Sequence, residues 1–249
     1  MSIIRFIIRF ILLIFAVSLI LPIVILTIAI AQKQKNRKLN KRTLNFWSRL
    51  LCRICGLKVV TSGKIHKNPI FIVANHISWL DIPVIHSYKL VGFVAKEEIS
   101  RWPILGWIVK SGETLFMVRG KQESRKKVLE LIDFRLNNGR SIAVFPEGKV
   151  TDGSYVSRFH RQLMQAAIET KTPIQAIAIK YKKKNGERNK NVAFLDDESF
   201  VKNVFRILSI PSSIVELNFC TPIKTNDISA RTAANITFEQ VKEQVNEDT

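Results

Sequence analysis

The feature that most constrains this chain is an uncharged apolar stretch near its N-terminus, from Ile11 to Ile30. At about 1.5 Å per residue, a stretch of this length forms a helix about 30 Å long, the thickness of the hydrocarbon core of a bilayer. We therefore predict that residues 1–40 form an N-terminal membrane-anchoring helical segment with a basic flank. Pro22 predicts a kink near its middle. The pattern leaves open whether the segment crosses the bilayer or returns at Pro22 as a re-entrant hairpin.

The charges around this stretch predict its orientation. Arg5 and Arg9 precede it, whereas a denser basic group follows it directly: Lys33, Lys35, Arg37, Lys38, Lys41 and Arg42. By the positive-inside rule, the downstream side lies in the cytoplasm, which predicts a single N-terminal anchor in the cytoplasmic (inner) membrane with the rest of the chain on the cytoplasmic side. A signal peptide cleaved after Ala29-Ile30-Ala31 is the alternative, but the basic residues that follow oppose translocation.

The formal net charge of +19 raises the question of nucleic-acid binding. Residues 1–60 contain eleven Lys and Arg and no acidic residue, so anionic lipid is the nearer partner. No nucleic-acid motif accompanies the charge, and we expect membrane lipids, and no nucleic acid, as partners. Residues 43–55 have an amphipathic helical pattern that suits either lipid headgroups or ordinary core packing. The pair Cys52-x-x-Cys55 inside that pattern is expected to fill the core.

After Gly56, short apolar runs alternate with helical patterns, which predicts one α/β domain over residues 41–249. The predicted strands are Ile70–Ala74, Gly92–Ala95, Thr114–Val118, Ser141–Phe145, Ile174–Lys180 and Val215–Cys220. The predicted helices are Asp81–Tyr88, Pro103–Lys110, Lys121–Asn138, Phe159–Thr170, Ser199–Leu208 and Ser229–Asn246. This order favours a mostly parallel central sheet flanked by helices. Such sheets bind ligands at the carboxyl ends of their strands, so residues that follow the apolar runs are the functional candidates.

The first candidates follow the run Ile70–Ala74. Asn75 and His76 stand where this strand gives way to a turn, and a helix is predicted from Asp81. If His76 lies in the turn, Asp81 can bond one imidazole nitrogen and leave the other as a general base. The spacing alone does not distinguish this pair from a turn histidine beside a helix-capping aspartate.

Two further segments also follow apolar runs. One is Phe145-Pro146-Glu147-Gly148, in which Gly148 permits close approach of the backbone to a ligand and Glu147 can accept hydrogen bonds from a hydroxyl-bearing substrate. The other ends in Arg119, a residue type that suits bidentate recognition of phosphate. A simple Pro-Glu-Gly turn and a solvated surface arginine are the alternatives.

In this order and spacing, the three segments resemble the motifs of the 1-acylglycerol-3-phosphate acyltransferase family of membrane-bound glycerolipid and lysophospholipid acyltransferases. Asn75, His76 and Asp81 match its N-H-x-x-x-x-D motif. Its F-P-E-G block is matched from Phe145 to Gly148, and its other two blocks are matched by Gly112, Phe116 and Arg119 and by Pro173-Ile174. N-H-x-x-x-x-D by itself is a weak signal, but the combination with F-P-E-G is specific.

The resemblance implies an enzyme that moves a fatty acyl group from an acyl thioester to the free hydroxyl of a lysolipid, in phospholipid biosynthesis. It implies that His76 is the base and that Asp81 orients it, whereas Asn75, Arg119 and the F-P-E-G block bind substrate. The acceptor that it favours is 1-acyl-sn-glycerol-3-phosphate, which gives phosphatidic acid. The donor is acyl-CoA or acyl carrier protein, and no metal or further cofactor is implied.

One departure from the family pattern concerns the acceptor. The family usually continues with Thr and often Arg after F-P-E-G, but here Lys149 and Val150 follow, and then Thr151-Asp152-Gly153. This is similar to a branch whose acceptors include lyso-ornithine lipid, and Lys149 is predicted to supply the charge for a phosphate. Two alternatives of another class also stay open: a hydrolase in which the same base activates water, and a non-catalytic protein that binds anionic membrane surfaces.

Overall fold

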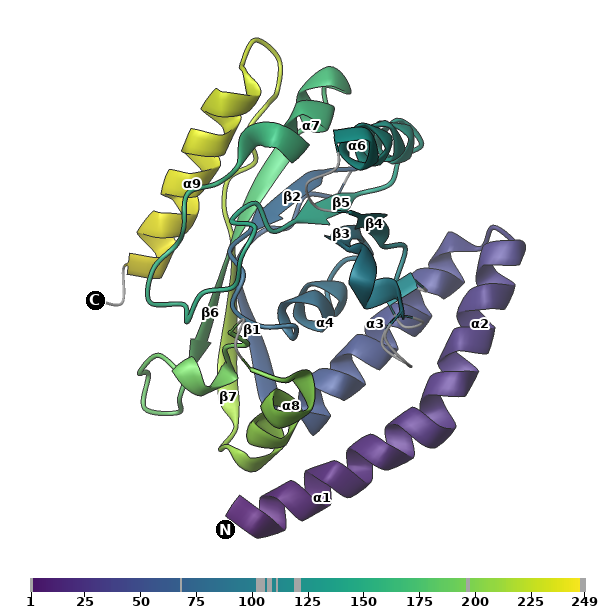
Figure 1. Cartoon of the computed structure of the whole chain (residues 1–249), viewed down its shortest axis with the longest axis vertical. Helices are drawn as coiled ribbons and strands as arrows, with labels where there is room; N and C mark the ends of the chain where they lie inside the picture. Colours follow the sequence, from purple (N-terminus) through teal and green to yellow (C-terminus); the bar gives the residue numbers. More distant parts are fainter. Residues whose placement is uncertain are drawn as a thin grey trace.

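The computed structural model describes residues 2–67, 69–101, 106, 109–110, 112–118, 122–195 and 198–246, without the side chain of Arg125. Most of the helix predicted at Pro103–Lys110 lies outside the described residues, as does Arg119. Within the described part, helices cover both faces of a central sheet, and a long N-terminal helical rod runs along one side of the domain (Figure 1).

The sheet of the described residues has seven strands in the order β1-β7-β6-β2-β5-β3-β4. Their bounds are Leu57–Gly63 (β1), Phe71–Ala74 (β2), Gly92–Lys96 (β3), Leu115–Met117 (β4), Ile142–Val144 (β5), Ile174–Lys182 (β6) and Ser213–Phe219 (β7). Neighbouring strands are parallel, except that β6 and β7 are antiparallel. The predicted α/β fold with a mostly parallel sheet is therefore confirmed.

The strand that the sequence did not predict is β1, at the edge of the sheet. It pairs with β7 alone, and its residues Lys58, Thr61 and Ser62 are exposed. An edge strand of this kind lacks the continuous apolar run of a buried parallel strand. By contrast, every residue of β2 and of β5 is buried, which is why the sequence marks these two strands clearly.

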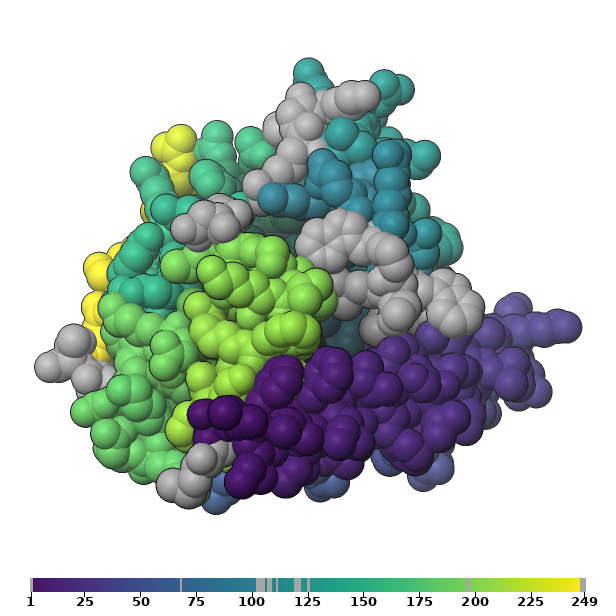
Figure 2. All heavy atoms as spheres, turned by 60° about the horizontal axis from the view of Figure 1, so that its bottom comes forward, coloured from purple at the N-terminus to yellow at the C-terminus, as the bar shows by residue number. Residues whose placement is uncertain are grey.

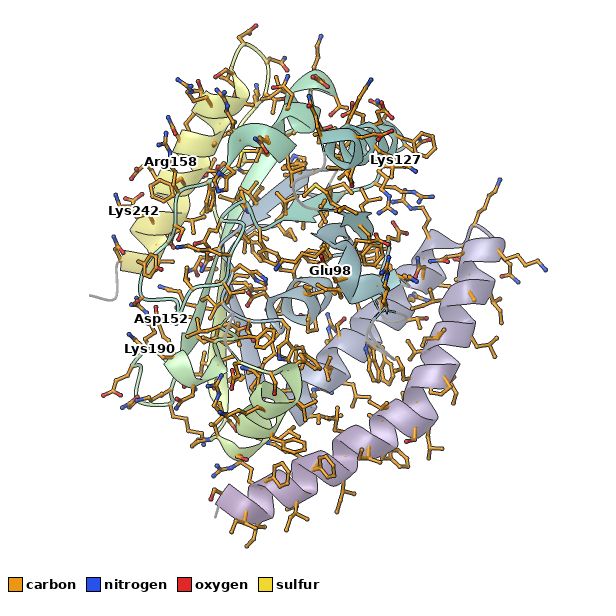
Figure 3. The ribbon with its side chains drawn as sticks, in the orientation of Figure 1. Glu98, Lys127, Asp152, Arg158, Lys190 and Lys242 are labelled. Carbon is orange, nitrogen blue, oxygen red and sulfur yellow. The ribbon has the colours of Figure 1, made fainter. Side chains whose placement is uncertain are left out.

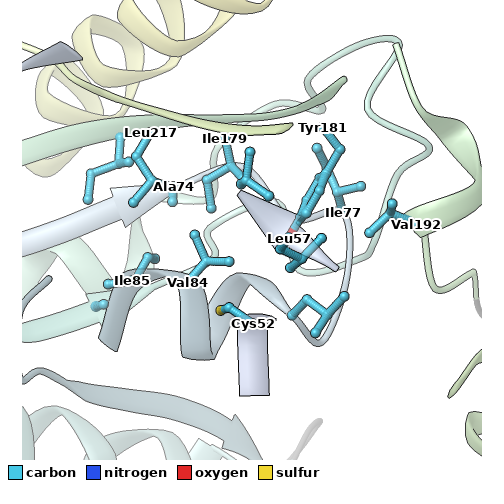
Figure 4. Close-up of a cluster of buried hydrophobic side chains, with 14 of the residues drawn as sticks. Cys52, Leu57, Ala74, Ile77, Val84, Ile85, Ile179, Tyr181, Val192 and Leu217 are labelled. Atoms are coloured by element: carbon cyan, nitrogen blue, oxygen red, sulfur yellow. The ribbon is translucent and has the colours of Figure 1, made fainter. Parts of the chain in front are cut away.

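Helices pack on the two faces of the sheet over separate cores. Their bounds are Arg37–Ile54 (α3), Asp81–His86 (α4), Gln122–Asn137 (α6), Gln165–Glu169 (α7), Phe200–Ser209 (α8) and Ala230–Asn246 (α9), with short 3₁₀ helices at Glu97–Arg101 (η2), Arg161–Met164 (η3) and Lys190–Val192 (η4). On one face, α3, α4 and α8 pack over side chains such as Leu217 and Ile179 (Figure 4). On the other face, α6, α7 and α9 pack over Val73 and Ile142.

The cysteine pair lies in the first of these cores, at the end of α3. Cys52 and Cys55 are both buried and free. Burial raises the pKa of the Cys55 thiol to about 12 and also raises the pKa of the Cys52 thiol. Thiols that stay protonated behave as small apolar side chains, so the prediction that this pair fills the core is confirmed.

The apolar N-terminal segment is one helical rod, Ser2–Lys33, long and apolar enough to cross a membrane. It consists of α1 (Ser2–Phe15), the π-helical turn η1 (Ala16–Ile20) and α2 (Leu21–Lys33). The π-helical turn ends at Ile20, two residues before Pro22. It accommodates the proline, which has no N–H to donate and whose ring crowds the carbonyl one turn earlier. The chain continues through Pro22 and reverses only after Lys33, so the hairpin considered at Pro22 does not form.

After that reversal, α3 runs back along α2. It begins at Arg37, earlier than the predicted start at residue 43, with the side chain of Asn36 as its N-cap. Leu44 and Trp47 pack against α2, whereas a basic face is left exposed: Lys38, Lys41, Arg42, Arg49 and Arg53. The predicted core packing of this amphipathic helix is therefore confirmed, and contact of its basic face with lipid headgroups stays a prediction.

The start of the rod is fastened to the domain by two arginines. The buried Arg9 donates from Nη1 to the carbonyl of Ile210 at 2.8 Å, and Arg5 donates to the carbonyl of Ser209 at 2.9 Å. These carbonyls lie at the C-terminal end of α8, where cations are favourable. The sequence presented both arginines as flanking charges of the apolar stretch, and this docking was not predicted.

Replacing Arg9 by Met keeps most of the side-chain volume but removes the charged donor. We expect the free energy of unfolding to fall by about 2 kcal/mol, because buried carbonyls of α8 lose a charge-assisted partner. Urea unfolding of the detergent-solubilised protein measures this effect, and Lys38→Met on the exposed face of α3 is the matched control. Equal stability of the two variants would show that Arg9 does not hold the rod.

Candidate active site

The loop between β2 and α4 contains the first motif, and Asn75 fixes its start. Asn75 is fully buried, and both ends of its amide bond the backbone of Ile179 in β6. Oδ1 accepts from the N–H at 2.8 Å, and Nδ2 donates to the carbonyl at 3.0 Å. Asn75 thus extends the pairing of β2 with β6 into the loop, which favours a structural role over the predicted contact with substrate.

His76 and Asp81 meet in the way that the turn was predicted to allow. Nδ1 of His76 lies 2.8 Å from Oδ2 of Asp81, the first residue of α4. The Asp81 side chain is fully buried, whereas 21% of the His76 side chain is exposed. If Nδ1–H donates to the carboxylate, Nε2 is left unprotonated, and it has no hydrogen bond to any described residue. This is the arrangement of a general base whose tautomer is set by a buried carboxylate.

Asp81 also holds the turn in shape. Its Oδ2 accepts the backbone N–H of Ile77 at 2.7 Å and that of Ser78 at 3.0 Å. Its Oδ1 accepts the hydroxyl of Tyr181 at 2.7 Å. A buried carboxylate needs such donors, because an unpaired buried charge is costly. The same bonds that stabilise Asp81 therefore determine where His76 points.

Phe145 forms a wall beside the histidine. It directly follows β5, and its ring stacks on the imidazole of His76 with centroids 4.0 Å apart and planes 11° apart. Phe93 of β3 also stacks on Phe145, at 5.6 Å. This stack opposes rotation of the imidazole, so it helps to keep Nε2 in one direction.

Glu147 is buried and connects the loop that contains His76 with the loop that contains Ser157. Only 3% of it is exposed, and its two oxygens accept different backbone donors: Oε1 from the N–H of His76 at 2.8 Å and Oε2 from that of Ser157 at 2.6 Å. Burial raises the pKa of Glu147, and the bonds from Ser157 and His76 offset part of that rise. Because both oxygens are already engaged, the structure favours bracing over the predicted contact with a substrate hydroxyl.

The loop that follows Gly148 folds back over the histidine turn. The N–H of Thr151 donates to the carbonyl of His76 at 2.9 Å. Asp152 forms an ion pair with Lys190 of η4 at 2.8 Å (Figure 3). Burial alone would raise the pKa of Asp152, but hydrogen bonds from Lys190 and Ser154 outweigh it and lower the pKa to about 2. This loop is therefore tied at several points to the rest of the site.

The other predicted substrate-binding residues are less closely tied to the dyad. Pro146 is buried, and its carbonyl accepts the N–H of His160 at 2.9 Å. Gly148 and Lys149 are exposed, and Nζ of Lys149 lies 5.9 Å from the centroid of the Tyr155 ring. Arg119 lies outside the described residues, so its predicted contact with phosphate stays a prediction. Across the described residues, no three His, Cys, Asp or Glu side chains gather as a metal site would require.

Sequence reasoning missed Tyr181. It lies on β6, one hundred residues from its partner Asp81, and no local spacing connects the two. The available signal was weaker: a hydroxyl-bearing side chain at the end of the apolar run Ile174–Lys180. Such a residue is either exposed or bonded to a buried acceptor, and the sequence does not say which.

Comparison with known proteins identifies the chain. Residues 56–180, half of its length, match the family model described as Acyltransferase. The chain belongs to the acyltransferase family. It is 32% identical to a lyso-ornithine lipid O-acyltransferase of Pseudomonas aeruginosa, over 76% of this chain and 73% of that protein. It is 28% identical to a 1-acyl-sn-glycerol-3-phosphate acyltransferase of Neisseria gonorrhoeae, over 66% and 64% respectively.

The fold agrees with a solved structure of this kind. The 1-acyl-sn-glycerophosphate acyltransferase PlsC from Thermotoga maritima superposes with a TM-score of 0.76, covering 99% of this chain and 95% of that one at 19% identity. At that identity the likeness concerns the fold. The resemblance drawn from the motifs is thus confirmed at the level of family and fold, and the roles of individual residues in this acyltransferase remain predictions.

Replacing Glu147 by Gln tests whether this residue acts as a brace. An amide has one oxygen and one NH₂ group, so one of the two backbone N–H groups would face a donor in place of an acceptor. We expect acyl transfer to fall at least tenfold and the free energy of unfolding to fall by about 2 kcal/mol. The matched control is Glu239→Gln on the exposed surface of α9. Lost activity with unchanged stability would instead indicate a direct contact with substrate.

Proposed function

We propose that this acyltransferase transfers a fatty acyl group from an acyl thioester to the free hydroxyl of a lysolipid. The observation that carries the proposal is the pair His76–Asp81, with Nδ1 of the imidazole 2.8 Å from the buried carboxylate and Nε2 without a bond to any described residue. Membership of the family supports the same chemistry.

In the proposed reaction, Nε2 of His76 removes the proton of the acceptor hydroxyl as its oxygen attacks the thioester carbonyl. Asp81 stabilises the imidazolium that forms. The C–S bond then breaks, an ester C–O bond replaces it, and the imidazolium returns its proton to the leaving thiolate. No covalent enzyme intermediate is needed, because the hydroxyl oxygen is itself the nucleophile. The acyl donor is acyl-CoA or acyl carrier protein, and no metal or other cofactor takes part.

The proposed acceptor is 1-acyl-sn-glycerol-3-phosphate, with lyso-ornithine lipid as the alternative. Relatives of both names match this chain, and neither acceptor is better supported by them. We propose that Lys149 and Arg119 hold the acceptor headgroup when it carries a phosphate. Lyso-ornithine lipid has no phosphate, so the demand for these two cations distinguishes the two acceptors.

The proposed location is the cytoplasmic face of the inner membrane. The rod presents an exposed apolar face: Ile3, Ile4, Ile7, Ile8, Ile11, Leu12, Ile14, Phe15, Leu19, Ile23, Leu26 and Ile30. Figure 2 shows the rod alongside α8, which adds exposed Val201 and Phe205. An apolar surface of this extent requires lipid or a partner, and the basic face of α3 suits anionic headgroups.

The dyad is tested by product analysis with purified protein. We expect His76→Ala to lower acyl transfer by about 10³-fold and Asp81→Asn by about 10²-fold, because general-base catalysis contributes gains of that order. The control is His66→Gln, which replaces a histidine whose side chain has no described role. Thiol release and diacyl lipid are measured together, with lysophosphatidic acid and lyso-ornithine lipid as separate acceptors. Near-normal transfer by His76→Ala would refute the mechanism, and free fatty acid as the main product would indicate a hydrolase.

Membrane attachment is tested by substitution on the exposed face of the rod. We expect the triple variant Ile4→Ser, Ile11→Ser, Phe15→Ser to bind vesicles at least 100-fold more weakly, because each buried apolar side chain contributes about 1.5–3 kcal/mol. Flotation with vesicles that contain anionic lipid measures this. Ile236→Ser, a partly exposed residue of α9, is the control. Unchanged flotation of the triple variant would exclude this face as the lipid contact.

A further inference from the structure

Tyr181 supplies a contact that the proposed mechanism does not yet use. Its hydroxyl donates to Oδ1 of Asp81 at 2.7 Å. Oδ2 is engaged by His76 and by the N–H groups of Ile77 and Ser78, so Tyr181 provides the hydrogen bond to the other oxygen among the described residues. Tyr181 is only 2% exposed and lies in the core beside α3 (Figure 4).

We propose that Tyr181 is a positioning residue of the acyl-transfer site, which acts through Asp81 to fix the direction and the proton affinity of His76. The inference rests on the proposed function, in which His76 is the base. It adds a residue outside the N-H-x-x-x-x-D and F-P-E-G motifs, contributed by β6, which pairs with β2 on the side opposite to β5.

The hydrogen bond to Oδ1 helps to set the plane of the Asp81 carboxylate. Hydrogen bonds to Oδ2 alone leave the plane of the Asp81 carboxylate able to turn. A hydrogen bond to Oδ1 opposes this rotation. β6 makes that bond from the same stretch in which Ile179 holds Asn75. Both ends of the histidine turn, Asn75 and Asp81, are therefore hydrogen-bonded to β6. The orientation of Nε2 depends on the sheet as well as on the loop.

The same hydrogen bond also changes how much negative charge Asp81 offers to His76. A donor on Oδ1 draws charge from the carboxylate and weakens its attraction for the imidazolium. Removing this donor would therefore strengthen the attraction between Asp81 and the imidazolium. Burial, and then the charge of Asp81, raise the pKa of Tyr181 well above its ordinary value, so the phenol remains a donor throughout the working range.

Other ionisable groups also face this cluster. Glu147 lies on the other side of His76, where it accepts the backbone N–H. Cys52 and Cys55 of α3 lie near Tyr181, and burial keeps both thiols protonated. Neither thiol therefore adds a charge beside Tyr181. A change at the Tyr181 hydroxyl thus reaches His76 through Asp81.

The first test is Tyr181→Phe, which retains the ring and its packing. We expect kcat to fall about tenfold at neutral pH with KM within twofold, and the acidic limb of the pH–rate profile to move to higher pH, because the dyad then holds its proton more tightly. Tyr88→Phe is the matched control, since Tyr88 packs on Phe219 at the edge of the same core. A purely structural role would lower the rate by one factor at every pH and leave the limb in place.

A second test strengthens the hydrogen bond from Tyr181 to Asp81 in place of removing it, so the pH–rate profile should shift in the opposite direction. The chain has three tyrosines, so the double variant Tyr88→Phe, Tyr155→Phe leaves Tyr181 as the only one. Biosynthetic replacement of that tyrosine by 3-fluorotyrosine gives a stronger donor of nearly the same size. We expect the acidic limb to move to lower pH, and this result does not depend on the folding of Tyr181→Phe.

The outcomes separate this inference from the proposed function. If the wild type forms diacyl lipid and His76→Ala does not, the proposed function stands. The inference is then overturned by a pH–rate profile of Tyr181→Phe, or of the fluorinated protein, that coincides with that of its control. If the wild type transfers no acyl group to any lysolipid, the proposed function fails first.

Discussion

The buried charge of Asp81 is the constraint on which the rest of the site depends. A carboxylate without access to water is tolerated only when donors surround it, and here the donors come from the turn, the imidazole and β6. These partners are not independent. The turn must close for its N–H groups to reach Oδ2, and the closed turn is what brings His76 beside a residue five positions along the chain. Stabilising the charge and building the base are thus one structural requirement.

The strand β6 holds the histidine turn rigidly in place. It pairs in parallel with β2 and antiparallel with β7, and all of its residues but the last are buried. Ile179 holds Asn75 through its backbone, and Tyr181, two residues further, holds Asp81 through its side chain. A shift of one residue in the register of β6 would send Tyr181 to the opposite face of the sheet. The same register that packs the core therefore also places the dyad.

The sequence predicted what is local and missed what is distant. β2 and β5 are short, fully buried runs, and the structure brings the residues that follow them together around His76. The edge strand β1 was not predicted, because a strand that pairs on one side only has a mixed polar and apolar composition. The hydrogen bond between Tyr181 and Asp81 was not predicted, because no spacing rule connects residues one hundred positions apart. Glu147 was predicted from its motif to bind substrate, but its two backbone partners, which favour a bracing role, depend on how two loops meet.

The same limit explains why the sequence indicated Arg5 and Arg9 only as charges that flank the apolar stretch. Their guanidinium groups bond carbonyls at the end of α8, and α8 also contains the buried Asn203, whose Oδ1 accepts from the indole of Trp79 at 3.0 Å. Trp79 belongs to the histidine turn. One helix therefore contacts both the apolar rod and the loop that holds the base. The bonds of Arg5 and Arg9 thus fasten the start of the rod to the same helix that, through Asn203, holds Trp79 of the histidine turn. A change in how the rod packs on α8 would therefore also act on the loop that positions His76.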